Sequence, residues 1–112
     1  MLKPCIIGLG YVGLPILLNL SKKIKTIGFD INKKRILDLK NSRDTFNEFK
    51  KRDFAKKKIF FTNDVLKAKS ANFFIVAVPT PISKSKYPDL SHLKKVSENI
   101  SKILKKGDII FF

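Results

Sequence analysis

Cysteine, arginine and acidic residues are scarce in this chain of 112 residues, and each shortage narrows what the protein can be. The single cysteine, Cys5, cannot form an internal disulfide, so the chain is no disulfide-held secreted domain and a cytoplasmic location is expected. No stretch approaches the roughly 20 apolar residues that cross a bilayer. The apolar run at the amino terminus is broken by glycines and lacks the form of a secretory signal. We expect residues 1–112 to make one small domain.

The shortage of acids leaves a formal charge of +15, which raises the question of nucleic-acid binding. Of the 24 basic residues only Arg35, Arg43 and Arg52 are arginines, the residue type that makes forked contacts to phosphates and base edges. The lysines are spread along the chain, and the densest basic runs are 50–52 and 56–58. We interpret them as solvated faces and loops that contact polyanions weakly and in a salt-sensitive way. A basic nucleic-acid-binding domain therefore ranks last among the hypotheses.

Glycine is also infrequent, yet three of the five glycines are gathered near the amino terminus. Gly8, Gly10 and Gly13 follow an apolar run with G-x-G-x-x-G spacing and lead into a second apolar run with helical character. In a dinucleotide site the first glycine turns the chain off a strand, the second admits a diphosphate, and the third packs helix on strand. The helix amino terminus then faces the anion. Taken alone, the motif also fits a glycine turn in another α/β protein.

An acid at the end of the next apolar run supports the dinucleotide interpretation. Asp30 closes the run 25–30 and lies about 20 residues beyond the glycines, where a carboxylate accepts the hydroxyls of an adenosine ribose. Because this carboxylate would repel a 2′-phosphate, NAD is expected rather than NADP. The alternative is that Asp30 is an acid at the start of a helix. Pro15 fits the first turn of the helix after the glycines, where a missing N–H costs little.

Apolar runs and breaker residues predict strands that alternate with helices, with 41–58 a basic loop that holds a short helix. This alternation predicts an α/β fold, a Rossmann-like doubly wound parallel sheet with strand order 3-2-1-4-5. The crevice would lie between the first and fourth strands, where 8–13 faces 78–81. Strands are expected at about 3–7, 26–29, 58–62, 72–78 and 108–112, and helices at about 11–20, 33–39, 64–69 and from 89 or 91 to 104.

Four ordered motifs carry a resemblance to a known family. They are 8–15 (GLGYVGLP), 28–32 (GFDIN), 78–81 (VPTP) and the later pair 88–90 (PDL) and 105–110 (KKGDII). Together they resemble the UDP-glucose/GDP-mannose dehydrogenase family. The later pair is similar to the branch that oxidises UDP-N-acetylhexosamines for surface polysaccharides. The resemblance covers essentially the whole chain and implies an NAD-dependent oxidoreductase that oxidises C6 of a UDP-sugar from alcohol to carboxylate.

The resemblance also implies roles for residues of this chain. Gly8, Gly10 and Gly13 would cradle the diphosphate, with the backbone at Tyr11 and Val12 closing on it.

Three side chains would complete the cofactor site. Asp30 would hold the adenine ribose, Arg35 would lie beside the ribose or adenine, and Thr80 would touch the cofactor at the end of the fourth strand. The alternatives are that Arg35 is an exposed helix cation and that the Thr80 hydroxyl serves only the local backbone.

The catalytic half of such an enzyme is not expected here. In the family, a glutamate-serine/threonine segment, the central helix, the sugar-binding domain and the catalytic cysteine, lysine and asparagine follow the fifth strand, whereas this sequence ends at Phe112. We therefore expect a truncated NAD-binding domain without catalytic or metal-ligating residues, with weak or no NAD binding and no turnover in isolation. Cys5 is expected to be a buried structural thiol, and His92 an exposed or helix-start residue.

One more hypothesis belongs to a different class. The chain could be a free-standing NAD-binding or regulatory module that acts with a separately encoded, complementing chain. Against it, a strand at 109–112 would leave an uncovered sheet edge. Homo-oligomerisation stays open, because dimers of the family use the missing central helix.

Overall fold

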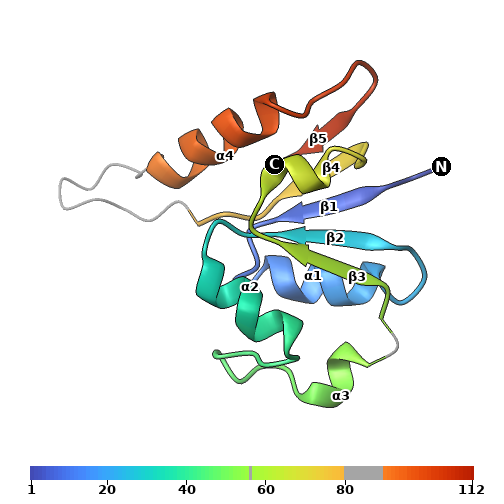
Figure 1. Ribbon diagram of the computed structural model, residues 1–112, viewed down its shortest axis with the longest axis vertical. Coiled ribbons are helices and arrows are strands. Elements are labelled where there is room, and N and C mark those ends of the chain that lie inside the picture. The colour runs from blue at the N-terminus through green and yellow to red at the C-terminus, as the bar shows by residue number, and fades with distance from the viewer. Residues whose placement is uncertain (56, 80–89) are drawn as a thin grey trace.

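The computed structural model of the chain describes residues 1–55, 57–79 and 90–112, and all five predicted strands lie within them. They form one parallel sheet in the order β3-β2-β1-β4-β5, which confirms the predicted Rossmann-like fold and strand order. All strand arrows point to the same side of the molecule (Figure 1). The strands are β1 (Pro4–Ile7), β2 (Thr26–Phe29), β3 (Ile59–Thr62), β4 (Phe73–Val76) and β5 (Ile109–Phe111).

Helices cover both faces of the sheet (Figure 1). One face packs against α1, α2 and α3, and the other packs against α4 and a short 3-10 helix, η1. Parallel strands joined by right-handed crossovers produce this two-sided cover. The helices are α1 (Gly13–Leu20), α2 (Lys33–Lys40), α3 (Lys51–Phe54), η1 (Val65–Ala68) and α4 (Ser91–Ser101).

The central strand β1 contributes to a hydrophobic core on each face. Successive strand side chains point to opposite faces, so Cys5 and Ile7 join the cluster under α4, whereas Ile6 joins the cluster under α1 and α2. Each of the three is at most 2% exposed. This two-sided burial explains why the strand is apolar at every position instead of alternating with polar residues.

Three element boundaries differ from the sequence prediction by two or more residues. Tyr11 and Val12 lie in the turn before α1 and not in the helix itself. β4 ends at Val76, two residues earlier than predicted, where its pairing with β1 ends at Ile7. α4 ends at Ser101, three residues early, and the chain leaves it through a tight turn in which Ile100 accepts two backbone N–H groups.

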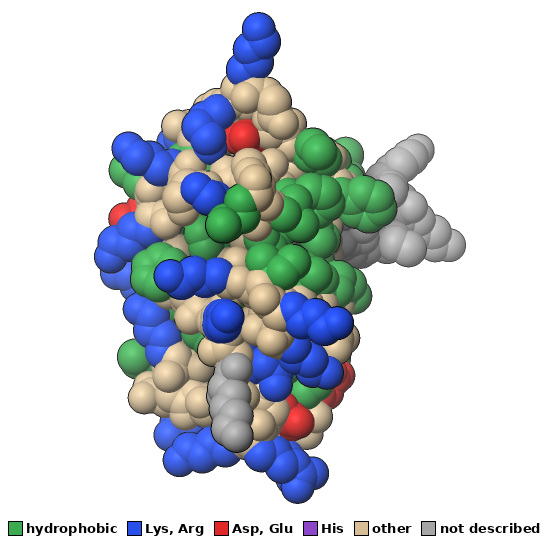
Figure 2. Space-filling view, turned by 90° about the vertical axis from the view of Figure 1, so that its right-hand side faces the viewer, with side chains coloured by type: hydrophobic (Ala, Val, Ile, Leu, Met, Phe, Trp, Pro, Cys, Tyr) green, Lys and Arg blue, Asp and Glu red, His purple; other side chains and the backbone are tan. Residues whose placement is uncertain are grey.

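The basic side chains are dispersed over the surface. Figure 2 shows Lys and Arg side chains over the whole height of one face, separated by hydrophobic and uncharged side chains. This distribution agrees with the interpretation of the lysines as a solvated surface. Among the described residues, no helix has the length and apolar character needed to cross a membrane.

Candidate cofactor-binding site

The turn from β1 into α1 depends on two glycines for close packing. Gly8 has a φ of +94°, a conformation that favours glycine, and a Cβ there would lie 2.8 Å from the carbonyl oxygen of Ala77. A Cβ on Gly13 would lie only 1.7 Å from the carbonyl oxygen of Gly8. These two positions therefore bring β1, the chain after β4 and the start of α1 into direct backbone contact.

Gly10 differs from both neighbours because it faces open space. A Cβ at this position would meet nothing within 4 Å. The backbone N–H groups of Gly10, Tyr11 and Val12 make no hydrogen bond to any residue in the described ranges. They lie just before the amino terminus of α1, whose first turn carries no acid. Free donors at the positive end of a helix form a cradle for an anion.

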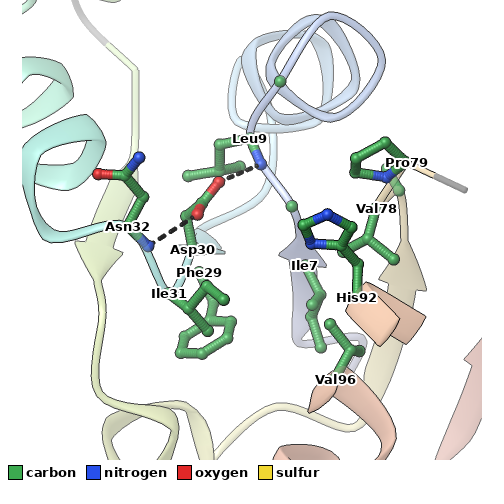
Figure 3. Close-up of a pocket in the computed structure, with 13 residues that line it drawn as sticks. Ile7, Leu9, Phe29, Asp30, Ile31, Asn32, Val78, Pro79, His92 and Val96 are labelled. Carbon is green, nitrogen blue, oxygen red and sulfur yellow. Dashed lines mark hydrogen bonds between the residues drawn. The ribbon is translucent and has the colours of Figure 1, made fainter. Parts of the chain in front are cut away.

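Asp30 stands beside this cradle at the end of β2. Its Oδ2 accepts the backbone N–H of Leu9 at 2.9 Å, and its Oδ1 accepts the N–H of Asn32 at 2.9 Å (Figure 3). An ionised carboxylate offers about four lone-pair sites, so each oxygen keeps acceptor capacity for a further donor. The side chain is partly exposed, and a ligand hydroxyl can reach it.

A cavity of about 320 Å³ opens between the ends of β1, β2 and β4. The predicted crevice is thus confirmed for the glycine loop and for the described residues Val78 and Pro79. Figure 3 shows apolar side chains along its inner wall and Asp30 at its rim. A mainly apolar pocket with few polar groups is typical of ligand sites. Its described lining consists of Ile7, Gly8, Leu9, Gly10, Phe29, Asp30, Ile31, Asn32, Ala77, Val78, Pro79, His92 and Val96.

Sequence reasoning missed the contribution of α4 to this cavity. Val96 is 3% exposed and lies on the wall, and His92, one helical turn earlier, extends toward the glycine loop (Figure 3). Residues four apart share a helix face, so the apolar residues Val96 and Ile100 of the predicted helix could also have placed His92 on that face. The prediction that His92 is an exposed residue at the helix start is confirmed.

Arg35 is buried, so the alternative of an exposed helix cation is wrong. It is 7% exposed, and its Nε donates to the carbonyl oxygen of Leu9 at 2.8 Å. Its Nη1 donates to Asp44 Oδ1 at 2.8 Å, and its guanidinium lies 4.5 Å from the centre of the Phe46 ring. Nη2 is buried and has no partner among the described residues. The last predicted site residue, Thr80, lies outside the described residues.

Asp44 supports Arg35 from the segment 41–58, which the sequence predicted as a basic loop that holds a short helix. The carboxylate accepts the backbone N–H groups of Phe46, Glu48 and Phe49 at 3.0–3.1 Å. Burial alone would raise the pKa of this carboxyl group. The hydrogen bonds from Arg35, Phe46 and Phe49 and the charge of Arg35 outweigh burial and hold the pKa below its ordinary value. Asp44 is therefore an ionised partner of Arg35 at neutral pH.

Cys5 is not a reactive nucleophile in this fold. Cys5 is fully buried in β1, and burial raises the pKa of its thiol to about 12, so a reactive thiolate is not populated at neutral pH. Within the described part of the chain, no three His, Cys, Asp or Glu residues are grouped so as to hold a metal ion.

Known proteins resemble this chain over nearly its whole length. UDP-N-acetyl-D-glucosamine 6-dehydrogenases from Salmonella typhi and Pseudomonas aeruginosa are 45% and 44% identical to it and match 98% and 99% of it. The solved UDP-D-ManNAc dehydrogenase of Pyrococcus horikoshii matches 97% of the chain with a TM-score of 0.89 and 26% identity.

The chain spans about a quarter of the length of these relatives, 26% of both curated proteins and 27% of the solved structure. A family model described as the NAD binding domain of the UDP-glucose/GDP-mannose dehydrogenase family matches residues 2–112. The geometry of the glycine loop and Asp30 agrees with that description. The chain therefore belongs to the UDP-glucose/GDP-mannose dehydrogenase family and matches its NAD-binding domain.

Proposed function

We propose that residues 1–112 form one NAD-binding domain that serves a cytoplasmic nucleotide-sugar dehydrogenase, which oxidises C6 of a UDP-sugar, in particular a UDP-N-acetylhexosamine. The observation that carries the proposal is the open anion cradle at Gly10 beside the Asp30 carboxylate. The names of the relatives support the sugar class, because the two most similar proteins described above are UDP-N-acetyl-D-glucosamine 6-dehydrogenases.

The residues present fit a dinucleotide. We propose that the free N–H groups of Gly10, Tyr11 and Val12 bind the diphosphate, since they have no partner among the described residues. The spare acceptor sites of Asp30 would take the ribose hydroxyls, and its charge would disfavour a 2′-phosphate. The apolar wall of the cavity, with Phe29 and Val78, would receive the adenine.

NAD, when bound, supplies the hydride acceptor for oxidation of the sugar. This chain's own residues would bind and orient it, and its single cysteine offers no nucleophile for the sugar. Cys5 is buried in the sheet with a raised thiol pKa, and no neighbouring base activates it. We propose that Thr80 touches the cofactor as the family resemblance implies. Sugar binding and covalent catalysis would depend on residues outside this chain.

A thermal-shift experiment tests cofactor binding. We expect millimolar NAD+ to raise the melting temperature of the purified chain, and equimolar NADP+ to raise it less, because a ligand that binds the folded state stabilises it. No shift with NAD+ would contradict the proposal for the isolated chain. A second assay follows absorbance of NADH with a UDP-N-acetylhexosamine added. NADH production by the chain alone would show that catalysis needs no further residues.

The exposed edge of the sheet favours a second proposal, a partner that covers β5. Among the described residues β5 pairs only with β4, and Ile109 and Phe111 are 54% and 63% exposed. Bare edge strands with exposed apolar side chains promote association. Co-purification with a complementing chain would support this proposal, and a stable monomer in light scattering would count against both that partner and a homo-oligomer.

A further inference from the structure

We propose that Asp44 is a positioning residue for the glycine loop and that it sets dinucleotide affinity by holding Arg35 against the carbonyl of Leu9. The inference rests on the proposed function, because it assigns a role in NAD binding to a residue outside the glycine motif. Its basis is a continuous chain of contacts from Asp44 to the free N–H of Gly10.

The first link in this chain is the backbone of Leu9, between the first two glycines. Asp30 accepts its N–H at 2.9 Å, and Arg35 Nε donates to its carbonyl oxygen at 2.8 Å. The peptide bond that joins this carbonyl to the N–H of Gly10 is planar and trans, so the two groups point in opposite directions. By holding the Leu9 oxygen on one side, Arg35 directs the unpaired Gly10 N–H to the other side.

The second link is the pair of Arg35 and Asp44. Their side chains are 7% and 1% exposed, and Nη1 lies 2.8 Å from Oδ1. Three backbone N–H groups from 46–49 also donate to this carboxylate, which fixes it in place. Removing the carboxylate would leave a buried guanidinium without its counter-ion and would cost several times more than loss of an exposed pair.

Asp44 also decides which acid Arg35 faces. Asp30 and Arg35 line a second cavity of about 250 Å³. Asp38 also lines it, but its carboxylate pairs with Lys34 at 2.9 Å and with Arg43 at 3.8 Å, whereas among the described residues Asp30 accepts only backbone N–H groups. Without Asp44, Asp30 is therefore the carboxylate across this cavity to which the guanidinium could turn. Such a pair would release the Leu9 carbonyl and occupy the acceptor sites of Asp30. Asp44 therefore keeps Arg35 on the Leu9 carbonyl and leaves the acceptor sites of Asp30 available to the cofactor.

An aromatic contact connects the same segment to the glycine loop at a second point. The rings of Tyr11 and Phe46 are stacked with their centres 4.4 Å apart and their planes 14° apart. Phe46 also lies over the Arg35 guanidinium at 4.5 Å. The loop beside Asp44 is thus packed against the residue whose N–H belongs to the anion cradle.

Titration calorimetry with NAD+ on the purified chain tests the proposal. We expect Asp44→Asn to weaken binding about tenfold, because the charge-assisted bond that orients Arg35 is lost. Asp108→Asn is the matched control, since Asp108 is a buried acid that pairs with Lys105 and accepts its backbone N–H near β5. The control should lose stability without losing affinity.

The background variant Arg35→Met separates positioning from general destabilisation. In that background Asp44→Asn should weaken NAD+ binding less than it does in the parent, because only the contact of Phe46 with Tyr11 then connects Asp44 to the glycine loop. Urea unfolding should still show a loss of stability, because the carboxylate supports the 46–49 backbone. Parent-like affinity of the single variant Asp44→Asn, or an undiminished effect in the Arg35→Met background, would overturn the proposal. If Asp44→Asn does not fold, Asp44→Glu replaces it. The NAD+ affinity of Asp44→Glu is then expected to lie between that of the parent and that of the Arg35→Met variant.

Failure of the proposed function gives a different result. In that case the parent chain itself shows no saturable binding of NAD+. The positioning role is then tested by NMR on the unliganded chain. The chemical shift of the Gly10 amide should change in Asp44→Asn and stay unchanged in Asp108→Asn. An unshifted Gly10 resonance in both variants would refute the positioning role.

Discussion

Replacing Gly13 with alanine would place a methyl group at the closest approach of α1 to the end of β1. The new Cβ would lie 1.7 Å from the carbonyl oxygen of Gly8, whereas ordinary contact begins at 3.4 Å, so helix and loop must separate by about 1.7 Å. The methyl carbon is bonded directly to Cα and the oxygen belongs to the backbone, so rotation of a side chain cannot relieve the conflict. Overpacking of this kind costs about 1–3 kcal/mol.

Alanine offsets part of that cost because it favours a helix over glycine by up to about 1 kcal/mol. The net cost is the overpacking cost less this gain. We expect Gly13→Ala to lower the free energy of unfolding by about 2 kcal/mol, toward the upper end of that net cost, because the backbone must move. For a domain of this size each kcal/mol corresponds to roughly 4–8 °C, so the melting temperature should fall by about 10 °C. Urea and thermal unfolding, followed by circular dichroism, measure both quantities.

Gly10→Ala is the control for this experiment. Its methyl would meet nothing within 4 Å, so stability should stay within about 0.5 kcal/mol of the parent. The same methyl would project into the proposed diphosphate site and should weaken NAD+ binding at least about tenfold. A Gly13→Ala chain as stable as the parent would refute the packing argument, and a Gly10→Ala chain with parent affinity would refute the cradle.

Three further predictions concern single acids and the thiol. Asp30→Asn should weaken NAD+ binding at least about tenfold and reduce the preference for NAD+ over NADP+. Calorimetry with both cofactors measures these affinities, and unchanged affinities for both would contradict the assignment. Cys5 of the folded chain should resist a thiol reagent at mildly alkaline pH, because burial raises the pKa of its thiol to about 12. In concentrated guanidinium chloride it should react fully. Rapid labelling of the folded chain would contradict the burial of this thiol. The folded pKa of Asp44 is below its ordinary value of 3.8, so its stabilising contribution is complete above that pH and is lost as the pH falls through the folded value. The difference in unfolding free energy between parent and Asp44→Asn should therefore shrink in acid, and a difference independent of pH would contradict it.

The strands and the glycine loop could be predicted because local sequence alone determines them. The apolar run of β1 stops at a glycine whose φ of +94° suits no other residue as well, so the turn is visible in the sequence. The order of the strands then follows from right-handed crossovers. Asp30 could be placed for the same reason, since the end of β2 lies beside the end of β1 in this topology.

The support behind the site could not be predicted in this way. Segment 44–49 has no apolar period, and its conformation depends on one carboxylate that accepts three backbone N–H groups. Asn47 has a positive φ of 58° in this segment, which a sequence pattern does not reveal. The sequence left open whether Arg35 is an exposed cation, because its burial requires Asp44, nine residues later, as a partner. Long-range pairing of this kind leaves no local signal.

The high positive charge of the chain and its proposed affinity for NAD+ have separate physical origins. None of the described residues around the cavity beside Gly10 and Asp30 is Lys or Arg. Of the cations at the second cavity, Lys34 pairs with Asp38 at 2.9 Å and Arg35 with Asp44 at 2.8 Å. In the proposed site, recognition of the diphosphate therefore depends on backbone N–H groups and the helix dipole, which act at short range.

This separation predicts different responses to salt. Binding of DNA to the dispersed lysines releases counterions and should be lost steeply as salt rises through physiological strength. NAD+ affinity should change by less than about threefold over the same range, because no unpaired lysine or arginine of the described site contributes to it. Calorimetry with NAD+ and a filter-binding assay with DNA, run on one preparation across a salt series, compare the two. A steep fall of NAD+ affinity with salt would mean that surface lysines, and not the glycine loop, bind the diphosphate.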